Sequence, residues 1–232
     1  MEYRRLGEIA IHNTIETREK LLISAQNEFL KYGYEKASLR TICKNVGLTT
    51  GALYFFFNNK EDLFESLVKK IAKSFKEIIC TFVEREKENY KNILNDNCKY
   101  IDNSYYHIEH ERKFMKYMYA NKNAFILLAM KSQGSCYENY YDEVLQLVEG
   151  LFREFLEMYK GKTSRNPNIN EYTIHCLVSW RMHSYINVLN SNLTLHEALT
   201  QAEVIANYAV GGWNRIMKNS FESLDYNSML AT

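Results

Sequence analysis

Between Lys36 and Lys60 the chain carries four basic residues and no aspartate or glutamate. The whole chain is nearly balanced, with 29 basic residues against 28 acidic ones, so this stretch is a local concentration of positive charge. Its basic residues are Lys36, Arg40, Lys44 and Lys60. Contacts with phosphates dominate the affinity of proteins for DNA, and they need such an acid-free surface. The chemistry that these residues favour is anion binding, with a nucleic acid as the partner.

The same stretch has the steric pattern of two short helices that cross through a tight turn. Cys43 is a small residue where the helices would touch, and Gly47 supplies the left-handed turn position. Apolar residues fill the buried positions, namely Ile42, Val46, Leu48, Leu53 and Phe56. Thr49, Thr50 and the start of the second helix can approach the major groove of DNA. A helix pair without any DNA-binding role is the alternative that the steric pattern leaves open.

The stretch that begins at Ser38 resembles the DNA-binding region of the TetR family of bacterial regulators. The family hallmark is Leu-Tyr-x-x-Phe followed by Lys-x-x-Leu. In this chain the hallmark residues are Leu53, Tyr54, Phe57, Lys60 and Leu63. The resemblance covers roughly residues 14–68, less than a third of the chain.

This resemblance implies which residues meet DNA. Tyr54 and Lys60 are expected on phosphates, Arg40 and residues 49–52 in the groove, and Phe55 stacked near the DNA backbone. The full set of DNA-binding candidates is Ser38, Arg40, Thr49, Thr50, Gly51, Ala52, Tyr54, Phe55 and Lys60. Two positions depart from the family pattern, because Cys43 stands where alanine is usual and Phe56 where a polar residue is frequent. The Cys43 thiol is expected to serve packing, with redox sensitivity as the alternative.

The elements that must position these residues are helices. One proline and nine glycines in 232 residues are too few for a sandwich or barrel, and apolar residues recur at three- and four-residue spacing. We therefore predict an all-α fold of about nine to ten helices. A first helix is expected from Asn13 or Thr14 to Tyr32, with Gly33 as its left-handed stop. The later helices are expected after caps at Ser38, at Thr49 or Thr50 and at Asn58 or Asn59 (reaching the mid-80s), and near residues 91–102, 104–120, 122–132, 137–160, 170–190 and 194–219.

Two domains are expected. Residues 1–62 would form a three-helix helix-turn-helix domain, and the resemblance implies that residues 63–232 form a larger helical domain for effector binding and dimerisation. The longest apolar run, Ala124 to Met130, is too short to cross a membrane, and no export signal is visible, so we expect a cytoplasmic protein.

Catalytic and metal-binding chemistry find no support in the sequence. Five widely spaced cysteines suggest neither a disulfide framework nor a zinc ribbon. His107 and His110, flanked by Glu109 and Glu111, have metal-like spacing but are more typical of a solvated helix face. No phosphate loop, nucleophile elbow or catalytic triad can be proposed, so neither an enzyme nor a cofactor is expected.

The later part of the chain is rich in aromatic residues. Fourteen of the 18 tyrosines and both tryptophans follow residue 63, which suits a pocket for a small, mostly apolar effector. The ligand-binding candidates are Tyr106, Phe114, Tyr117, Phe125, Tyr141 and Phe155, with ordinary core and surface packing as the alternative. Arg181 is the only charged side chain between Tyr172 and His196. If buried, it needs an anion, which is either a structural carboxylate or a group on a ligand.

The last predicted helix carries small residues along one ridge, which would let another helix approach closely. The candidates for a dimer interface are Ala198, Ala202, Ala206, Ala209, Gly212, Trp213 and Ile216. Packing within one chain is the alternative. A homodimer would double the DNA contacts of one short recognition helix.

The sequence therefore predicts a ligand-responsive repressor that binds a palindromic double-stranded DNA operator as a homodimer, with no membrane partner. One alternative is a DNA-binding regulator controlled by a protein partner, without a small-molecule pocket. The other is an enzyme that carries a helix-turn-helix.

Overall fold

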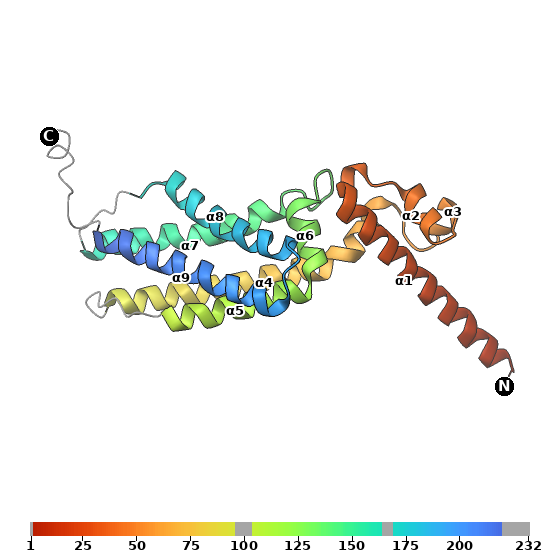
Figure 1. The fold of residues 1–232 in the computed structure, drawn as a ribbon, viewed down its shortest axis with the longest axis horizontal. Coiled ribbons are helices and arrows are strands. Elements are labelled where there is room, and N and C mark those ends of the chain that lie inside the picture. Colours follow the sequence, from red (N-terminus) through yellow and green to blue (C-terminus); the bar gives the residue numbers. More distant parts are fainter. Residues whose placement is uncertain (1, 96–103, 164–168, 220–232) are drawn as a thin grey trace. The chain divides into compact units, whose positions relative to one another are not determined.

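In the computed structural model the chain is helical, as the sequence predicts. The structure describes residues 2–95, 104–163 and 169–219, with side chains over residues 14–92, 108–162 and 169–216. Within these ranges there are nine helices and no strand (Figure 1): α1 (Glu2–Lys36), α2 (Leu39–Asn45), α3 (Thr50–Leu53), α4 (Lys60–Asn95), α5 (Ser104–Ala120), α6 (Lys122–Met130), α7 (Tyr140–Thr163), α8 (Glu171–Asn190) and α9 (Leu195–Asn219). In the part of the chain so described, none of the helices combines the length and the apolar character that crossing a membrane requires.

The helix boundaries after residue 104 lie within a few residues of the predicted ones. Two predicted boundaries before residue 104 are wrong. Helix α1 begins at Glu2 rather than near Asn13, and α4 continues to Asn95, so residues 91–95 do not start a new helix. Because no glycine or proline interrupts residues 60–95, no local signal ends α4 in the 80s. The rest of the predicted 91–102 helix falls outside the described residues.

The chain folds into two compact units, each built from two segments. The first unit comprises Met1–Lys76 and Asn121–Asp142, and the second comprises Glu77–Ala120 and Glu143–Thr232. This division differs from the predicted one at residue 62, because the start of α4 and all of α6 belong to the first unit. Helix α6 packs against α1 there, a long-range contact that no local sequence pattern announces.

Hydrogen bonds in the first unit join the end of α1 to the segment after α6. Gly33, with a φ of 77°, interrupts the regular α1 helix as predicted. The N–H of Tyr34 then donates to the carbonyl oxygen of Lys131 at 2.8 Å. The carboxylate of Glu61 accepts from the Tyr34 hydroxyl at 2.8 Å and from the Cys136 N–H at 3.1 Å. The start of α4 is thereby tied to both segments.

The core of the first unit is aromatic. The rings of Phe29 and Phe64 meet edge to face with centroids 5.1 Å apart, and both side chains are fully buried. Ala25 of α1 lies in the same core as predicted, together with Leu21 rather than the predicted Leu22, which is half-buried. The Ser24 hydroxyl donates to the carbonyl oxygen of Ile42 at 2.9 Å, which fixes α2 against α1.

Replacing Phe29 by alanine is predicted to destabilise the protein strongly. The substitution leaves a cavity beside Phe64, and such losses cost about 3–5 kcal/mol in the free energy of unfolding. Urea denaturation followed by far-UV circular dichroism measures the change. Ile23→Ala, at an exposed position of the same helix, is the matched control and should change stability by less than about 0.5 kcal/mol. Equal effects of the two substitutions would contradict the assignment of Phe29 to the core.

Candidate nucleic-acid interface and buried polar sites

Two capped helices and a glycine turn form the centre of the predicted helix-turn-helix. The Ser38 hydroxyl accepts a hydrogen bond from the Thr41 N–H at 3.3 Å, and this caps α2. The Thr49 hydroxyl accepts from the Ala52 N–H at 3.2 Å and caps α3. Gly47, with a φ of 71°, makes the turn between the two helices. The predicted cap at Ser38, the choice of Thr49 over Thr50 and the glycine turn are therefore settled by the backbone geometry.

Helix α3 has one buried side and one exposed side. Leu53 is buried within it, and Phe57 is buried just after it, under the guanidinium of Arg18 at 5.0 Å. Thr50 and Gly51 are exposed. Tyr54 and Phe55 follow α3 with 56% and 78% of their surfaces exposed, which is unusual for aromatic residues.

Phe56, where the family often has a polar residue, is half-buried. Its ring meets the ring of Phe55 edge to face, with centroids 5.1 Å apart. The sequence pattern predicts a third helix that carries Leu53, Phe56 and Phe57, but α3 ends at Leu53. The contact restricts the orientation of the exposed Phe55 ring.

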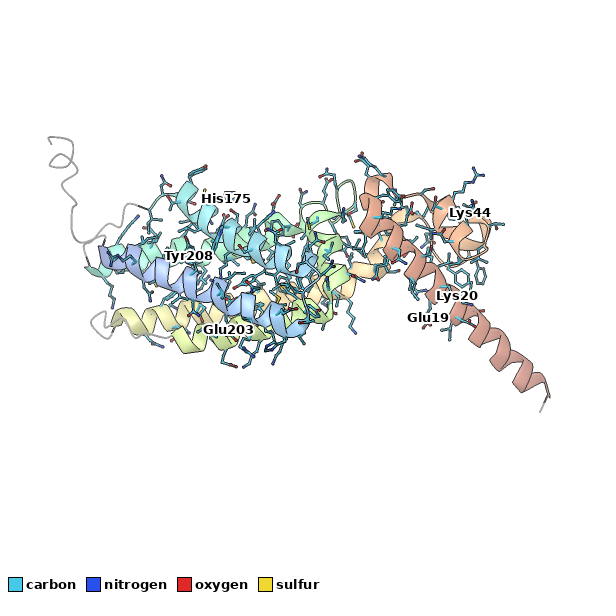
Figure 2. The ribbon with its side chains drawn as sticks, in the orientation of Figure 1. Glu19, Lys20, Lys44, His175, Glu203 and Tyr208 are labelled. Carbon is cyan, nitrogen blue, oxygen red and sulfur yellow. The ribbon has the colours of Figure 1, made fainter. Side chains whose placement is uncertain are left out.

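The basic residues of this stretch fall into two groups. Lys36, Arg40 and Lys44 are exposed, and Lys44 extends from α2 in Figure 2. Lys60 is half-buried, and its ammonium donates to the carbonyl oxygen of Glu35 at 3.0 Å while lying 4.8 Å from the centre of the Tyr34 ring. Burial lowers the pKa of Lys60. No local sequence pattern indicates this structural contact, and a phosphate contact of Lys60 stays a prediction.

Cys43 is buried within α2. Burial raises the pKa of its thiol, which keeps the thiol protonated and unreactive. These properties favour the packing role over redox sensitivity.

The predicted ligand-binding residues are divided between the two units. Phe125 and Tyr141 belong to the first unit, whereas Phe114, Tyr117 and Phe155 belong to the second. Phe125 is a core residue whose ring meets Phe75 at 4.7 Å, and Phe155 is equally buried in its own unit. The side chain of Tyr106, in α5, lies outside the described residues.

Arg181 has a structural partner. Its guanidinium forms an ion pair with the carboxylate of Glu111, which projects from α5 and is buried. Of the two anions that the sequence left open, the structure assigns the carboxylate of the chain itself. The ion pair supports the structural alternative, and a ligand contact of Arg181 stays a prediction.

Glu86 is a buried carboxyl group that sequence reasoning missed. Only 2% of its surface is exposed, and it accepts a hydrogen bond from the Asn89 amide at 3.2 Å. Burial raises its pKa, and the opposing effects of Arg85, Asn89 and Arg181 do not cancel the increase. The negative charge of Glu111 adds to the increase.

Glu86→Gln is predicted to change how stability depends on pH. Because the folded-state pKa of Glu86 is raised, folding favours its protonated form, and ionisation at higher pH lowers the free energy of unfolding. The wild-type protein thus loses stability as pH rises through that raised pKa, a loss that glutamine does not share. Urea unfolding between about pH 4 and about pH 8 should show the variant gaining on the wild type as pH rises. Glu84→Gln, at an exposed position of α4, is the matched control, and a flat difference for both variants would contradict the prediction.

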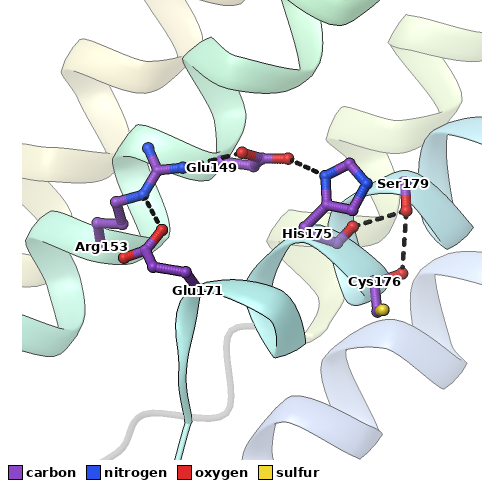
Figure 3. Close-up of polar contacts among 6 residues, drawn as sticks. All are labelled: Glu149, Arg153, Glu171, His175, Cys176 and Ser179. Carbon is purple, nitrogen blue, oxygen red and sulfur yellow. Dashed lines mark hydrogen bonds and ion pairs between the residues drawn. The ribbon is translucent and has the colours of Figure 1, made fainter.

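A polar cluster links α7 to α8 (Figure 3). The buried carboxylate of Glu149 lies 2.8 Å from Nδ1 of His175 and accepts from Nη2 of Arg153 at 2.9 Å. Nε of Arg153 also donates to Glu171 at 2.5 Å. The Ser179 hydroxyl donates to the backbone carbonyl oxygen of His175 at 2.6 Å, so it is paired with the helix backbone rather than with the imidazole. The cluster therefore connects two helices and forms no nucleophile–base pair.

Of the two histidines with metal-like spacing, His110 has a described side chain, and it packs among aromatic rings. The His110 ring lies against the rings of Phe82 and Phe114, each at 5.0 Å, and Glu111 pairs with Arg181. The His107 side chain lies outside the described residues. Over the described ranges, no group of three or more metal-ligating side chains comes together.

Three of the predicted dimer contacts face the inside of their own chain. Ala198, Ala202 and Ala206 have no exposed surface, and α9 packs against α5. Their assignment to a dimer interface is wrong, because the ridge of small residues serves close packing within the second unit. Trp213 packs on Phe152 at 4.9 Å. Ala209 and Ile216 are half-buried and Gly212 is exposed, so their dimer contacts stay predictions.

Helices α8 and α9 also carry large apolar side chains that are exposed. We call it the α8–α9 face, and it consists of Tyr172, Leu177, Trp180, Val204 and Tyr208. The rings of Trp180 and Tyr208 lie 4.9 Å apart, and Tyr208, labelled in Figure 2, has 70% of its surface exposed. The scarcity of charge in α8 was the sequence signal for this face.

The family match to known proteins lies in the first unit. Residues 21–67 match the family described as bacterial regulatory proteins, tetR family. The HTH-type transcriptional repressor BepR of Brucella suis is 34% identical over 79 residues, which are 34% of this chain and 38% of that relative. The HTH-type transcriptional regulator TtgR of Pseudomonas putida is 36% identical over 56 residues, covering 24% of this chain and 27% of that relative. The matches thus span less than two-fifths of the length of these curated relatives.

A solved structure of the fatty acid degradation regulator FadR from Bacillus halodurans shares 18% sequence identity, with a TM-score of 0.44, over 84% of this chain and 95% of that one. The relatives that match in sequence are transcriptional regulators and not enzymes. The matched residues contain the capped helices and the glycine turn described above. Over residues 21–67 the chain is therefore similar to the tetR family of bacterial regulatory proteins.

Proposed function

We propose that this protein is a ligand-responsive transcriptional repressor that binds a palindromic DNA operator as a homodimer in the cytoplasm. The observation that carries the proposal is the surface formed by α2, α3 and the turn after α3. Arg40 and Lys44 are exposed on it, Tyr54 and Phe55 project from it, and its sequence contains no acidic residue.

Each of these side chains suits a different part of DNA. Arg40 and Lys44 offer positive charge to phosphates, and the Tyr54 hydroxyl can donate a hydrogen bond to a phosphate oxygen. Thr50 and Gly51 are exposed at the start of α3, where small residues let the backbone approach base edges. Phe55 offers an apolar edge to a sugar or a thymine methyl group. Because Ser38 and Thr49 cap helices, their role is to hold this surface in place.

Arg40→Ala is predicted to weaken DNA binding and to reduce its salt dependence. Losing one phosphate contact per subunit should make the slope of log K against log salt shallower by roughly 0.9 per half-site. Fluorescence anisotropy with the upstream intergenic DNA of the protein's own gene, against a scrambled duplex, measures both quantities. Tyr54→Phe tests the hydroxyl in the same assay, and should weaken binding without changing the slope.

Lys69→Ala is the matched control, because Lys69 is an exposed lysine of the first unit outside this surface. It should bind as the wild type does. Wild-type affinities that are equal for the two duplexes and unaffected by Arg40→Ala would argue against the proposed operator contact.

The homodimer is proposed from the α8–α9 face. Large exposed apolar side chains on α8 and α9, with the Trp180 and Tyr208 rings 4.9 Å apart, support an interaction surface there. The one charged residue of α8 in this stretch, Arg181, is engaged by Glu111 and does not interrupt the face. Gly211 and Gly212 are exposed on α9, and a Cβ added at either would meet no atom within 4 Å in the chain, so a second helix has room to approach. A second copy of the chain places a second helix-turn-helix on the other half of a palindrome.

Val204→Asp is predicted to prevent dimerisation without unfolding the chain. The substitution puts a charge into a face that the dimer would bury, and an uncompensated charge there is strongly unfavourable. Size-exclusion chromatography with light scattering should show a dimer for the wild type and a monomer for the variant, with operator affinity reduced by more than about tenfold.

Lys113→Asp, at an exposed position of α5, is the matched control and should remain a dimer. A wild-type monomer, or a Val204→Asp variant that dimerises like the wild type, would contradict this interface. A monomer that keeps the exposed face would instead favour the alternative of a regulator controlled by a protein partner.

A further inference from the structure

Two phenylalanine rings directly after α3 give the proposed DNA-binding surface an apolar edge. Phe55 has 78% of its surface exposed, more than any other large apolar side chain in the described part of the chain. Phe56 stands at the position where the tetR pattern often has a polar residue. A phenyl ring has no polar atom to donate or accept a hydrogen bond. This edge therefore contacts DNA in a different way from Arg40 and Tyr54.

The Phe55 ring is held in place although it is exposed. Its contact with the Phe56 ring is edge to face, with centroids 5.1 Å apart and an interplanar angle of 85°. The Phe56 N–H donates to the carbonyl oxygen of the buried Leu53 at 2.9 Å. The Phe55 N–H donates to the carbonyl oxygen of Ala52 at 3.3 Å. A side chain that is already held in one orientation loses less freedom on binding, so the pair suits contact with one defined group.

The place of Phe55 in the chain favours a base over the sugar–phosphate backbone. Gly51 precedes it by four residues, about one helical turn, and is exposed near the start of α3. Tyr54 keeps helical dihedral angles, with φ −66° and ψ −11°, so Phe55 lies close to the side of Gly51. Glycine has no side chain to keep the backbone away from base edges. Phe55 therefore comes close to the bases when α3 approaches them.

The apolar group that base pairs present in the major groove is the 5-methyl group of thymine. Contacts with the sugar and the phosphates carry no sequence information directly. We propose that Phe55 recognises the methyl group of one thymine in each operator half-site, and that Phe56 is the residue that positions it. This inference rests on the proposed DNA-binding function and names a base that the operator contains.

The test begins with the DNA that the full chain itself selects from a pool of random duplexes. In the selected duplex each thymine is replaced in turn by uracil, which differs from thymine only in lacking the methyl group. Fluorescence anisotropy measures the affinity for each duplex. One thymine per half-site should respond, with binding about fourfold weaker for one replacement and about fifteenfold weaker when both half-sites are changed.

Variants connect this response to the ring pair. Phe55→Ala should bind the thymine and uracil duplexes equally, and Phe56→Ala should make the difference smaller. The salt dependence should stay unchanged, because neither ring carries charge. Tyr32→Ala removes an exposed ring of α1 outside this surface, and as the matched control it should keep the full difference. Circular dichroism checks that each variant is folded.

A second probe adds the methyl group to another base. Cytosine and 5-methylcytosine, each paired with guanine, are placed where the responsive thymine stood. The wild type should bind the methylated duplex more tightly than the unmethylated one, by about fourfold for one half-site, and Phe55→Ala should bind both equally.

Equal binding of thymine and uracil duplexes by the wild type would overturn the inference, as would a methyl effect that survives Phe55→Ala. An enriched palindrome without any methyl effect would leave the DNA-binding proposal intact and overturn the thymine contact alone. If the wild type enriches no sequence from the pool, both the proposed function and this inference are wrong.

Discussion

The DNA-binding surface depends on packing that holds a helix too short to be stable by itself. Helix α3 has four residues, and isolated helices of that length do not persist in water. Its position is fixed by burial of Leu53 and Phe57, by the Thr49 cap and by the cation–ring contact between Arg18 and Phe57. Helix α1 therefore determines where Tyr54 and Phe55 project, although it contributes none of the candidate DNA contacts.

The first unit is built from two segments that are separate in the sequence. Residues 121–142 join it because α6 packs on α1 and because Glu61 accepts hydrogen bonds from both Tyr34 and Cys136. Lys60, next to Glu61, holds the end of α1 through the Glu35 carbonyl oxygen. The first turn of α4 is thus where three segments distant in the sequence meet. A change in any one of these segments would therefore alter the contacts of the first turn of α4, which follows the helix-turn-helix.

The features that the sequence predicted have local causes. The caps at Ser38 and Thr49 and the turn at Gly47 depend on residues within four positions of each other, so their types alone identify them. Arg181 and Glu111 are 70 residues apart, and the choice between a structural and a ligand anion required the packing of α8. Likewise, the small alanine side chains of α9 predict close packing of another helix, but they do not indicate whether that helix belongs to the same chain or to a second copy. Glu86 escaped notice because a buried glutamate in a helix looks like a surface glutamate in sequence.

Regulation needs more than a binding site for an effector. If an effector lowers the affinity for the operator by some factor, the operator must lower the affinity for the effector by the same factor. A ligand that binds the DNA-bound and the free protein equally well changes nothing, however tightly it binds. Glu61 and Glu86 lie on one continuous helix, α4, which contributes to both units. An effector bound in the second unit therefore regulates DNA binding only to the extent that α4 differs between the two states.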